Sequence, residues 1–61
     1  MTIMNLIINN FNSGAAYVVP DITDSSEAEK LFELMELNMD NVEWMLTEQE
    51  VEFINKADYG L

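Results

Sequence analysis

"TIMNLIINNF", residues 2–11, is the stretch from which the predicted fold follows. In an extended chain, Met4, Leu6 and Ile8 lie on one side, while asparagines alternate with isoleucines on the other. This alternation predicts a strand. The turn formers of "NNFNSG" and the β-branched and aromatic residues of "AAYVVP" come next, as far as Pro20. We therefore predict an antiparallel two-stranded β-hairpin over residues 2–19, with a loop longer than two residues.

A helix is predicted to cover this hairpin, because an isolated hairpin is only marginally stable in water. The N-cap candidates are Asp24, Ser25 and Ser26, and Glu27 or Glu29 closes a capping box. Apolar side chains then recur at helical spacing and form one stripe: Leu31, Phe32, Met35 and Met39. These features predict a helix over residues 25–38.

The remainder of the chain is predicted to be helical as well. Asn38, Asp40 and Asn41 interrupt the apolar pattern, which favours a break followed by a short helix over residues 40–46. Thr47 then opens a T-x-x-E capping box with Glu50, which predicts a last helix over residues 48–58. The expected fold class is α+β: one domain, residues 1–61, in which a two-stranded hairpin packs against two or three helices.

Composition excludes most kinds of active site. The chain has 61 residues, no cysteine and no histidine, so disulfides and the usual zinc sites are closed to it. The chain therefore lacks histidine, the commonest general base in catalysis, and it has no glycine-rich phosphate loop. The acids at residues 21–29 do not have the spacing of a calcium loop, and a capped helix explains them better. We expect no catalytic residue, no metal and no cofactor.

The acidic side chains are unevenly distributed. The net charge is −10, yet residues 1–20 contain no charged side chain. On a helix that reaches Asp40, four acids spaced by four, three and four residues form one column: Glu29, Glu33, Glu36 and Asp40. Successive carboxylates are then roughly 4.5 to 6 Å apart along the helix axis, which resembles the spacing of phosphates along a nucleic-acid strand. Glu43 extends this field, and Trp44 is a candidate interface anchor. The predicted partner-binding residues are Glu29, Glu33, Glu36, Asp40, Glu43 and Trp44.

Two alternatives stay open for these residues. Charged stripes opposite apolar stripes are found on most surface helices, so the column is alternatively a solvated face. Trp44 is either a core residue or an interface residue. The excess of negative charge favours a binding function for the column, because an ordinary protein surface mixes positive and negative charges, whereas this chain has twelve acids and two lysines. A basic partner is therefore expected.

In size, charge and the column Glu29, Glu33, Glu36 and Asp40, the chain resembles the small acidic proteins that bacteriophages make against host enzymes, such as DNA mimics, anti-restriction proteins and anti-CRISPR inhibitors. The resemblance covers residues 21–58. It implies a non-catalytic inhibitor that presents a DNA- or RNA-like negative face to a nuclease, a CRISPR or restriction complex, or a polymerase. It also implies the host cytoplasm as the location.

Two other functions are compatible with the same residues. One is an antitoxin-like or regulatory protein that masks a basic partner without imitating nucleic acid. The other is a small assembly protein that oligomerises through an edge of its hairpin, with a homodimer as the simplest product. Direct binding to nucleic acid or to an anionic membrane is not expected from so acidic a chain. The absence of a positive n-region and of a long apolar run predicts a cytoplasmic protein.

Overall fold

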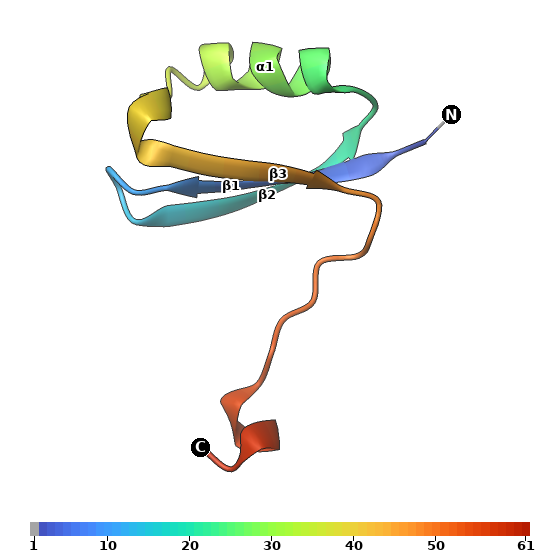
Figure 1. Cartoon of the computed structure of the whole chain (residues 1–61), viewed down its shortest axis with the longest axis vertical. Coiled ribbons are helices and arrows are strands. Elements are labelled where there is room, and N and C mark those ends of the chain that lie inside the picture. Colours follow the sequence, from blue (N-terminus) through green and yellow to red (C-terminus); the bar gives the residue numbers. More distant parts are fainter. Residues whose placement is uncertain (1) are drawn as a thin grey trace.

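The protein is a thin two-layer structure, in which one helix lies over one face of a three-stranded antiparallel sheet (Figure 1). The computed structural model describes residues 2–61. The elements are β1 (Met4–Asn10), β2 (Ala15–Ile22), α1 (Ser25–Leu34), the 3₁₀ turn η1 (Met39–Asn41), β3 (Val42–Thr47) and the 3₁₀ turn η2 (Lys56–Tyr59). The predicted fold, a two-stranded hairpin against two or three helices, is wrong. The described chain has a third strand and a single α-helix.

Strand β1 is the centre of the sheet, whose order is β2-β1-β3. It pairs antiparallel with both neighbours, so β2 and β3 run parallel to each other and α1 is the crossover between them. The loop at residues 11–14 ends at Gly14, whose φ of 73° is one that glycine adopts without steric cost. Near the other end of β2, the register shifts between Met4 and Leu6, and Asp21 there has a φ of 64°. This bulge occupies one end of an exposed sheet edge.

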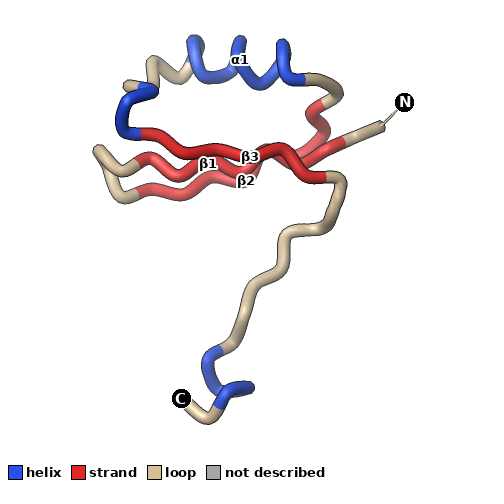
Figure 2. The backbone as a smooth tube through the Cα atoms, viewed as in Figure 1, coloured by secondary structure: helices blue, strands red, loops and turns tan. Residues whose placement is uncertain are grey.

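Helix α1 lies over one face of the sheet (Figure 2), and the core is made by side chains of the helix and of that face. Leu6 and Ile8 of β1 are fully buried, and they meet Ala28 and Phe32 of α1. Ile22 is the remaining buried apolar residue. Five buried side chains are a small core for a chain of this length, as expected where one face of the sheet has no cover.

Helix α1 begins where the sequence predicts. Asp24 is the N-cap, and its carboxylate accepts a hydrogen bond of 2.9 Å from the backbone N–H of Glu27. Glu27 in turn accepts a 2.7 Å hydrogen bond from the Thr23 hydroxyl. A capping interaction of this kind typically contributes about 1 kcal/mol to stability.

The helix ends at Leu34, four residues before the predicted end. Glu36 has a φ of 55°, in the left-handed region, and its N–H donates to the Glu33 carbonyl. The N–H of Leu37 donates to the Phe32 carbonyl over 3.2 Å. These two bonds form a Schellman motif, in which glutamate occupies the position that usually holds glycine. The prediction of a helix over residues 25–38 is therefore wrong at its C-terminal end.

The segment predicted as a short helix, residues 40–46, is mostly strand β3. The helical part is confined to η1, where the Asn38 side chain accepts a hydrogen bond from the N–H of Asp40. From Val42 onward, β3 pairs with β1 over its whole length, so that Trp44 lies opposite Ile8 and Leu46 opposite Leu6. Valine, tryptophan and leucine at alternate positions are typical of a strand with one face on a core.

The predicted helix over residues 48–58 is also wrong. Residues 48–55 form no helix or strand, and only the four residues of η2 are helical. The chain leaves the end of β3 on the side of the sheet opposite α1 and extends away from the domain (Figure 1). We call residues 48–61 the arm. Phe53, a large apolar side chain on the arm, is 88% exposed.

Candidate binding site: the groove between α1 and β3

An open groove of about 440 Å³ lies between α1 and β3. We call it the groove, and its lining residues are Glu29, Phe32, Glu33, Leu37, Met39 and Trp44. They come from three parts of the chain: the helix, the connection that follows it, and strand β3. Three of the six predicted partner-binding residues are among them. Since β3 is an edge strand, the groove lies at the margin of the domain.

The apolar part of the groove is built around two aromatic rings. The centroids of Phe32 and Trp44 are 5.2 Å apart, and the ring planes are inclined by 57°. This tilted arrangement is one that aromatic pairs prefer. Phe32 is buried in the core, whereas Trp44 is 41% exposed. Trp44 is therefore a surface residue that packs against one ring of the core, and its exposed part is open to a ligand.

The acidic part of the groove comes from one edge of α1. Glu29 and Glu33 are four residues apart, so they lie one turn apart on the same side of the helix, beside Phe32. Lys30 is the only basic residue in the sequence of α1, and it lines a different hollow, together with Leu31 and Leu34. Lys30 is three residues before Glu33, but it does not line the groove beside the two carboxylates.

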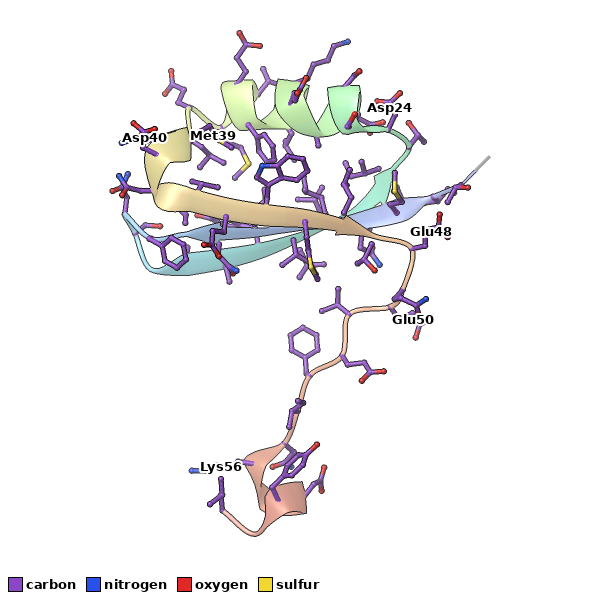
Figure 3. The ribbon with its side chains drawn as sticks, in the orientation of Figure 1. Asp24, Met39, Asp40, Glu48, Glu50 and Lys56 are labelled. Atoms are coloured by element: carbon purple, nitrogen blue, oxygen red, sulfur yellow. The ribbon has the colours of Figure 1, made fainter. Side chains whose placement is uncertain are left out.

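The predicted acidic column does not form a single row. Glu29 and Glu33 are on α1, but Glu36 occupies the left-handed turn after the helix and Asp40 is in η1. Figure 3 shows Met39 and Asp40 where the chain returns from α1 to the sheet. The regular rise of 1.5 Å per residue that underlies the phosphate-like spacing therefore stops at Leu34.

Glu43 is separated from the groove by the sheet itself. It lies opposite Asn9 in the β1–β3 ladder, one residue out of phase with the Trp44–Ile8 pair. Side chains of successive strand residues point to opposite faces, so Glu43 is on the face that α1 does not cover. Of the predicted partner-binding residues, Glu29, Glu33 and Trp44 are together in the groove, and Glu36, Asp40 and Glu43 do not line it.

No protein-family model, curated protein or solved structure matches this chain.

Within residues 2–61, no group of three acidic side chains is placed to hold a metal ion. The described residues also contain no helix that is long and apolar enough to cross a membrane.

Sequence reasoning missed three lining residues of the groove. Phe32 and Met39 were predicted to pack on the hairpin, and Leu37, which lies off the apolar stripe, was expected to be covered by a later helix or by a partner. The signal for Leu37 is the Schellman motif, which usually brings an apolar residue at this position against the third residue from the helix end, here Phe32. Because glutamate rather than glycine takes the left-handed position, the sequence gives little warning of the motif.

The groove is suited to hold a side chain that is both apolar and positively charged. Its aromatic and aliphatic residues offer contact area, and its two carboxylates accept charge-assisted hydrogen bonds. An arginine guanidinium can stack on an indole while its N–H groups reach carboxylates, and the carbon chains of arginine and lysine both cover apolar surface. The arrangement therefore offers binding chemistry for a side chain of this kind.

Proposed function

We propose that this protein is a non-catalytic acidic binder that inhibits a basic, nucleic-acid-binding protein by occupying a basic segment of it. The groove is the contact site in this proposal. The observation that carries it is the convergence of Glu29, Glu33 and the half-exposed Trp44 around one apolar hollow. An exposed tryptophan beside uncompensated acids is a suitable anchor for an arginine or lysine.

The ligand chemistry follows from the two parts of the groove. A purely cationic segment would be attracted by the carboxylates but would leave the rings of Phe32 and Trp44 without a partner. A purely apolar segment would bury the rings and gain nothing from the net charge of −10. The preferred segment therefore carries arginine or lysine together with leucine or an aromatic residue, as many nucleic-acid-binding surfaces do.

Masking of the basic partner explains the geometry better than imitation of a phosphate strand. Imitation relies on evenly spaced charges along one face, and the even spacing ends with α1 at Leu34. Masking needs only a local acidic and apolar contact, together with a negative field that speeds association. An antitoxin-like or regulatory role is thus favoured over strict mimicry, and a nuclease, a restriction or CRISPR complex and a polymerase remain the proposed classes of target.

The proposed setting is the cytoplasm, where such enzymes act on nucleic acid. If the resemblance to phage inhibitors holds, this compartment is the cytoplasm of a bacterial host. The partner would be bound stoichiometrically and released by salt, because ions screen pairs of exposed charges.

A fluorescence titration tests the groove directly, since Trp44 is the only tryptophan in the chain. The probe is a synthetic peptide of alternating arginine and leucine, compared with a peptide of the same charge in which glycine replaces leucine. We expect saturable changes in Trp44 emission with both peptides, tighter binding of the leucine peptide, and weaker binding as NaCl rises. Equal affinities for the two peptides would mean that net charge alone is responsible and that the apolar part of the groove has no role.

Paired charge reversals separate the groove from the general acidity. The variant Glu29→Lys/Glu33→Lys is compared with Glu50→Lys/Glu52→Lys, which changes the net charge equally but lies on the arm. Loss of two ion pairs and gain of repulsion should weaken binding at least about 10-fold in the groove variant. The arm variant should retain most of the affinity. Similar losses in both variants would contradict a specific site.

Inhibition is tested on a natural partner. The protein is immobilised and exposed to a bacterial lysate at low salt, and DNA or RNA is used to displace what binds. Recovery of a nucleic-acid-processing protein by the native chain, and not by Glu29→Lys/Glu33→Lys, supports the proposed target class. The same pair of proteins is then compared as inhibitors of the recovered enzyme. Binding without inhibition would reduce the proposal to an adaptor role.

A further inference from the structure

The face of the sheet opposite α1 has no cover within residues 2–61, and we call it the open face. Its side chains come from the strand positions that alternate with the core residues. The list is Asn5, Ile7 and Asn9 from β1, Ala16 and Val18 from β2, and Glu43, Met45 and Thr47 from β3. Val18 is 44% exposed and Met45 is 53% exposed. Because only Glu43 in this set is charged, the open face is a nearly neutral surface on a very acidic protein.

The arm carries a second set of apolar side chains, most of which are exposed to solvent. Phe53, Ile54, Tyr59 and Leu61 are all at least 70% exposed. In the extended segment 50–53, "EVEF", Val51 and Phe53 alternate with two glutamates. This period of two places the apolar pair on one side of the extended chain and the acids on the other. The arm therefore has an apolar side suited to lie on a flat surface.

The arm leaves its own domain in a fixed direction. The Asn5 side chain donates a 3.1 Å hydrogen bond to the carbonyl of Gln49, and the N–H of Gln49 donates to the Thr47 hydroxyl over 3.0 Å. Between Glu48 and Asn55 there is no glycine or proline to reverse the chain. Val51 still lies beside Ile7 and Met45 of its own open face, but from there the arm extends away from the sheet (Figure 1), and Phe53 and Ile54 are exposed.

The total exposed area indicates how much cover is missing. A compact monomer of 7.0 kDa exposes about 4,000 Å², whereas this chain exposes 4946 Å². The excess of about 900 Å² is close to the roughly 800 Å² that each partner buries in a standard protein–protein interface. The radius of gyration agrees, since it is 13.5 Å against about 10.5 Å for a compact chain of this length.

We propose that two copies of this chain form a symmetric dimer in which the arm of each copy lies on the open face of the other. A hollow of about 620 Å³ is already present where the open face meets the first residues of the arm. Ile7, Met45 and Val51 are its apolar lining, and Thr47, Gln49, Glu50 and Glu52 complete it. In the dimer, Phe53 of one copy enters this region of its partner. The arrangement is isologous, so both open faces and both arms are covered by the same contact.

A second copy fits this surface better than a basic protein does. Glu43 is the only acid among the strand residues of the open face, although Glu50 and Glu52 of the arm line the adjoining hollow. A basic partner therefore gains little from the strand surface itself, whereas a second copy brings apolar side chains that match it. Each copy carries a net charge of −10, so the two repel at low ionic strength. The dimer therefore strengthens as NaCl rises, which is the reverse of the salt dependence expected for the groove.

Cysteine cross-linking tests the contact, because the natural chain has no cysteine. Phe53→Cys and Met45→Cys are made as separate single variants, mixed in equal amounts and oxidised. The dimer predicts a disulfide-linked species of twice the chain mass that forms in the mixture. The control pairs Phe53→Cys with Leu34→Cys, which is 81% exposed on α1, on the other side of the sheet, and should link far less.

Two outcomes would overturn the dimer. If a variant with both cysteines closes the disulfide within one chain while the mixture of single variants does not react, the arm folds back on its own sheet. If sedimentation at high salt and high concentration gives the mass of one chain, the open face has another occupant or none. As an independent check, Phe53→Ser should weaken dimerisation by about 30-fold, the loss typical of an interface hot spot.

The dimer and the groove can fail separately, because they are on opposite faces of the sheet and use different residues. Phe53→Ser should leave the response of Trp44 to the arginine–leucine peptide unchanged. Conversely, Glu29→Lys/Glu33→Lys should leave Phe53→Cys free to link with Met45→Cys. A variant that abolishes both properties would indicate loss of folding, which circular dichroism detects.

Discussion

Replacing Glu36 with glycine should stabilise the protein, although glycine usually destabilises a helical region. Glu36 has a φ of 55° and occupies the left-handed position of the Schellman motif. A residue with a Cβ pays about 1–2 kcal/mol in this conformation, and glycine does not. Glycine also gains about 0.5–1 kcal/mol of freedom in the unfolded chain, which offsets part of the benefit. The net expectation is a stabilisation of about 0.5–1 kcal/mol.

Thermal unfolding followed by circular dichroism measures this effect at fixed protein and salt concentrations. In a domain of this size, a change of 1 kcal/mol shifts Tm by about 4–8 °C, so Glu36→Gly should raise Tm by about 2–8 °C. Glu36→Gln is the control for charge, because it removes the carboxylate but keeps the strained backbone. Its stability should stay within about 0.5 kcal/mol of the native chain.

A second control reverses the sign. Glu29 is in the middle of α1, where glycine lowers stability by about 0.5–1 kcal/mol. If Glu36→Gly lowered Tm as Glu29→Gly does, residue 36 would be within a helix. That result would refute the end of α1 at Leu34 and favour the longer helix that the apolar periodicity predicts.

Three further predictions concern folding. Asp24→Ala removes the N-cap of α1 and should destabilise the protein by about 1 kcal/mol, measured by urea unfolding. Leu6→Ala leaves a cavity in the core and should cost about 2–5 kcal/mol, whereas Leu34→Ala, at a position 81% exposed, should change stability by less than about 0.5 kcal/mol. Equal costs at the two leucines would contradict the position of the core. Adding NaCl to a low-salt buffer should raise Tm, because screening reduces the self-repulsion of a chain with a net charge of −10, and a fall would contradict this view of the charge.

The sequence predicts the first half of the fold better than the second. The alternation in residues 4–10, the turn formers before Gly14 and the cap at Asp24 each have a local physical cause that acts in the folded chain. The end of α1 could not be predicted in the same way. Glutamate in the left-handed position is uncommon, and the Leu37–Phe32 backbone hydrogen bond and the packing of Leu37 on the core favour it in place of glycine.

The segments after α1 were predicted as helices because the period of their apolar residues is ambiguous. Val42, Trp44 and Leu46 alternate as in a strand, and pairing with β1 supplies the hydrogen bonds that settle the choice. Such pairing between distant parts of the chain cannot be read from a local window. Just before the arm, a T-x-x-E pattern at Thr47 suggested a helix start, but the Thr47 hydroxyl accepts a hydrogen bond from the N–H of Gln49.

Part of the candidate site could be predicted from spacing alone. Glu29 and Glu33 are on one side of a real helix, so their proximity was a sound expectation. The association of Trp44 with them depends on β3 returning beside β1, which the predicted helix over residues 40–46 did not allow. The roles of Glu36, Asp40 and Glu43 in binding stay predictions, and none of these three residues lines the groove.

The most direct test of the proposed binding site is a titration of the isotopically labelled protein with the arginine–leucine peptide, followed by ¹H–¹⁵N correlation spectra. We expect the largest shifts at the indole N–H of Trp44 and at the backbone amides of Glu29, Phe32, Glu33 and Leu37. Signals of the arm and of Glu43 should move little. Shifts spread evenly over all the acidic residues, or concentrated on the arm, would contradict a binding site in the groove.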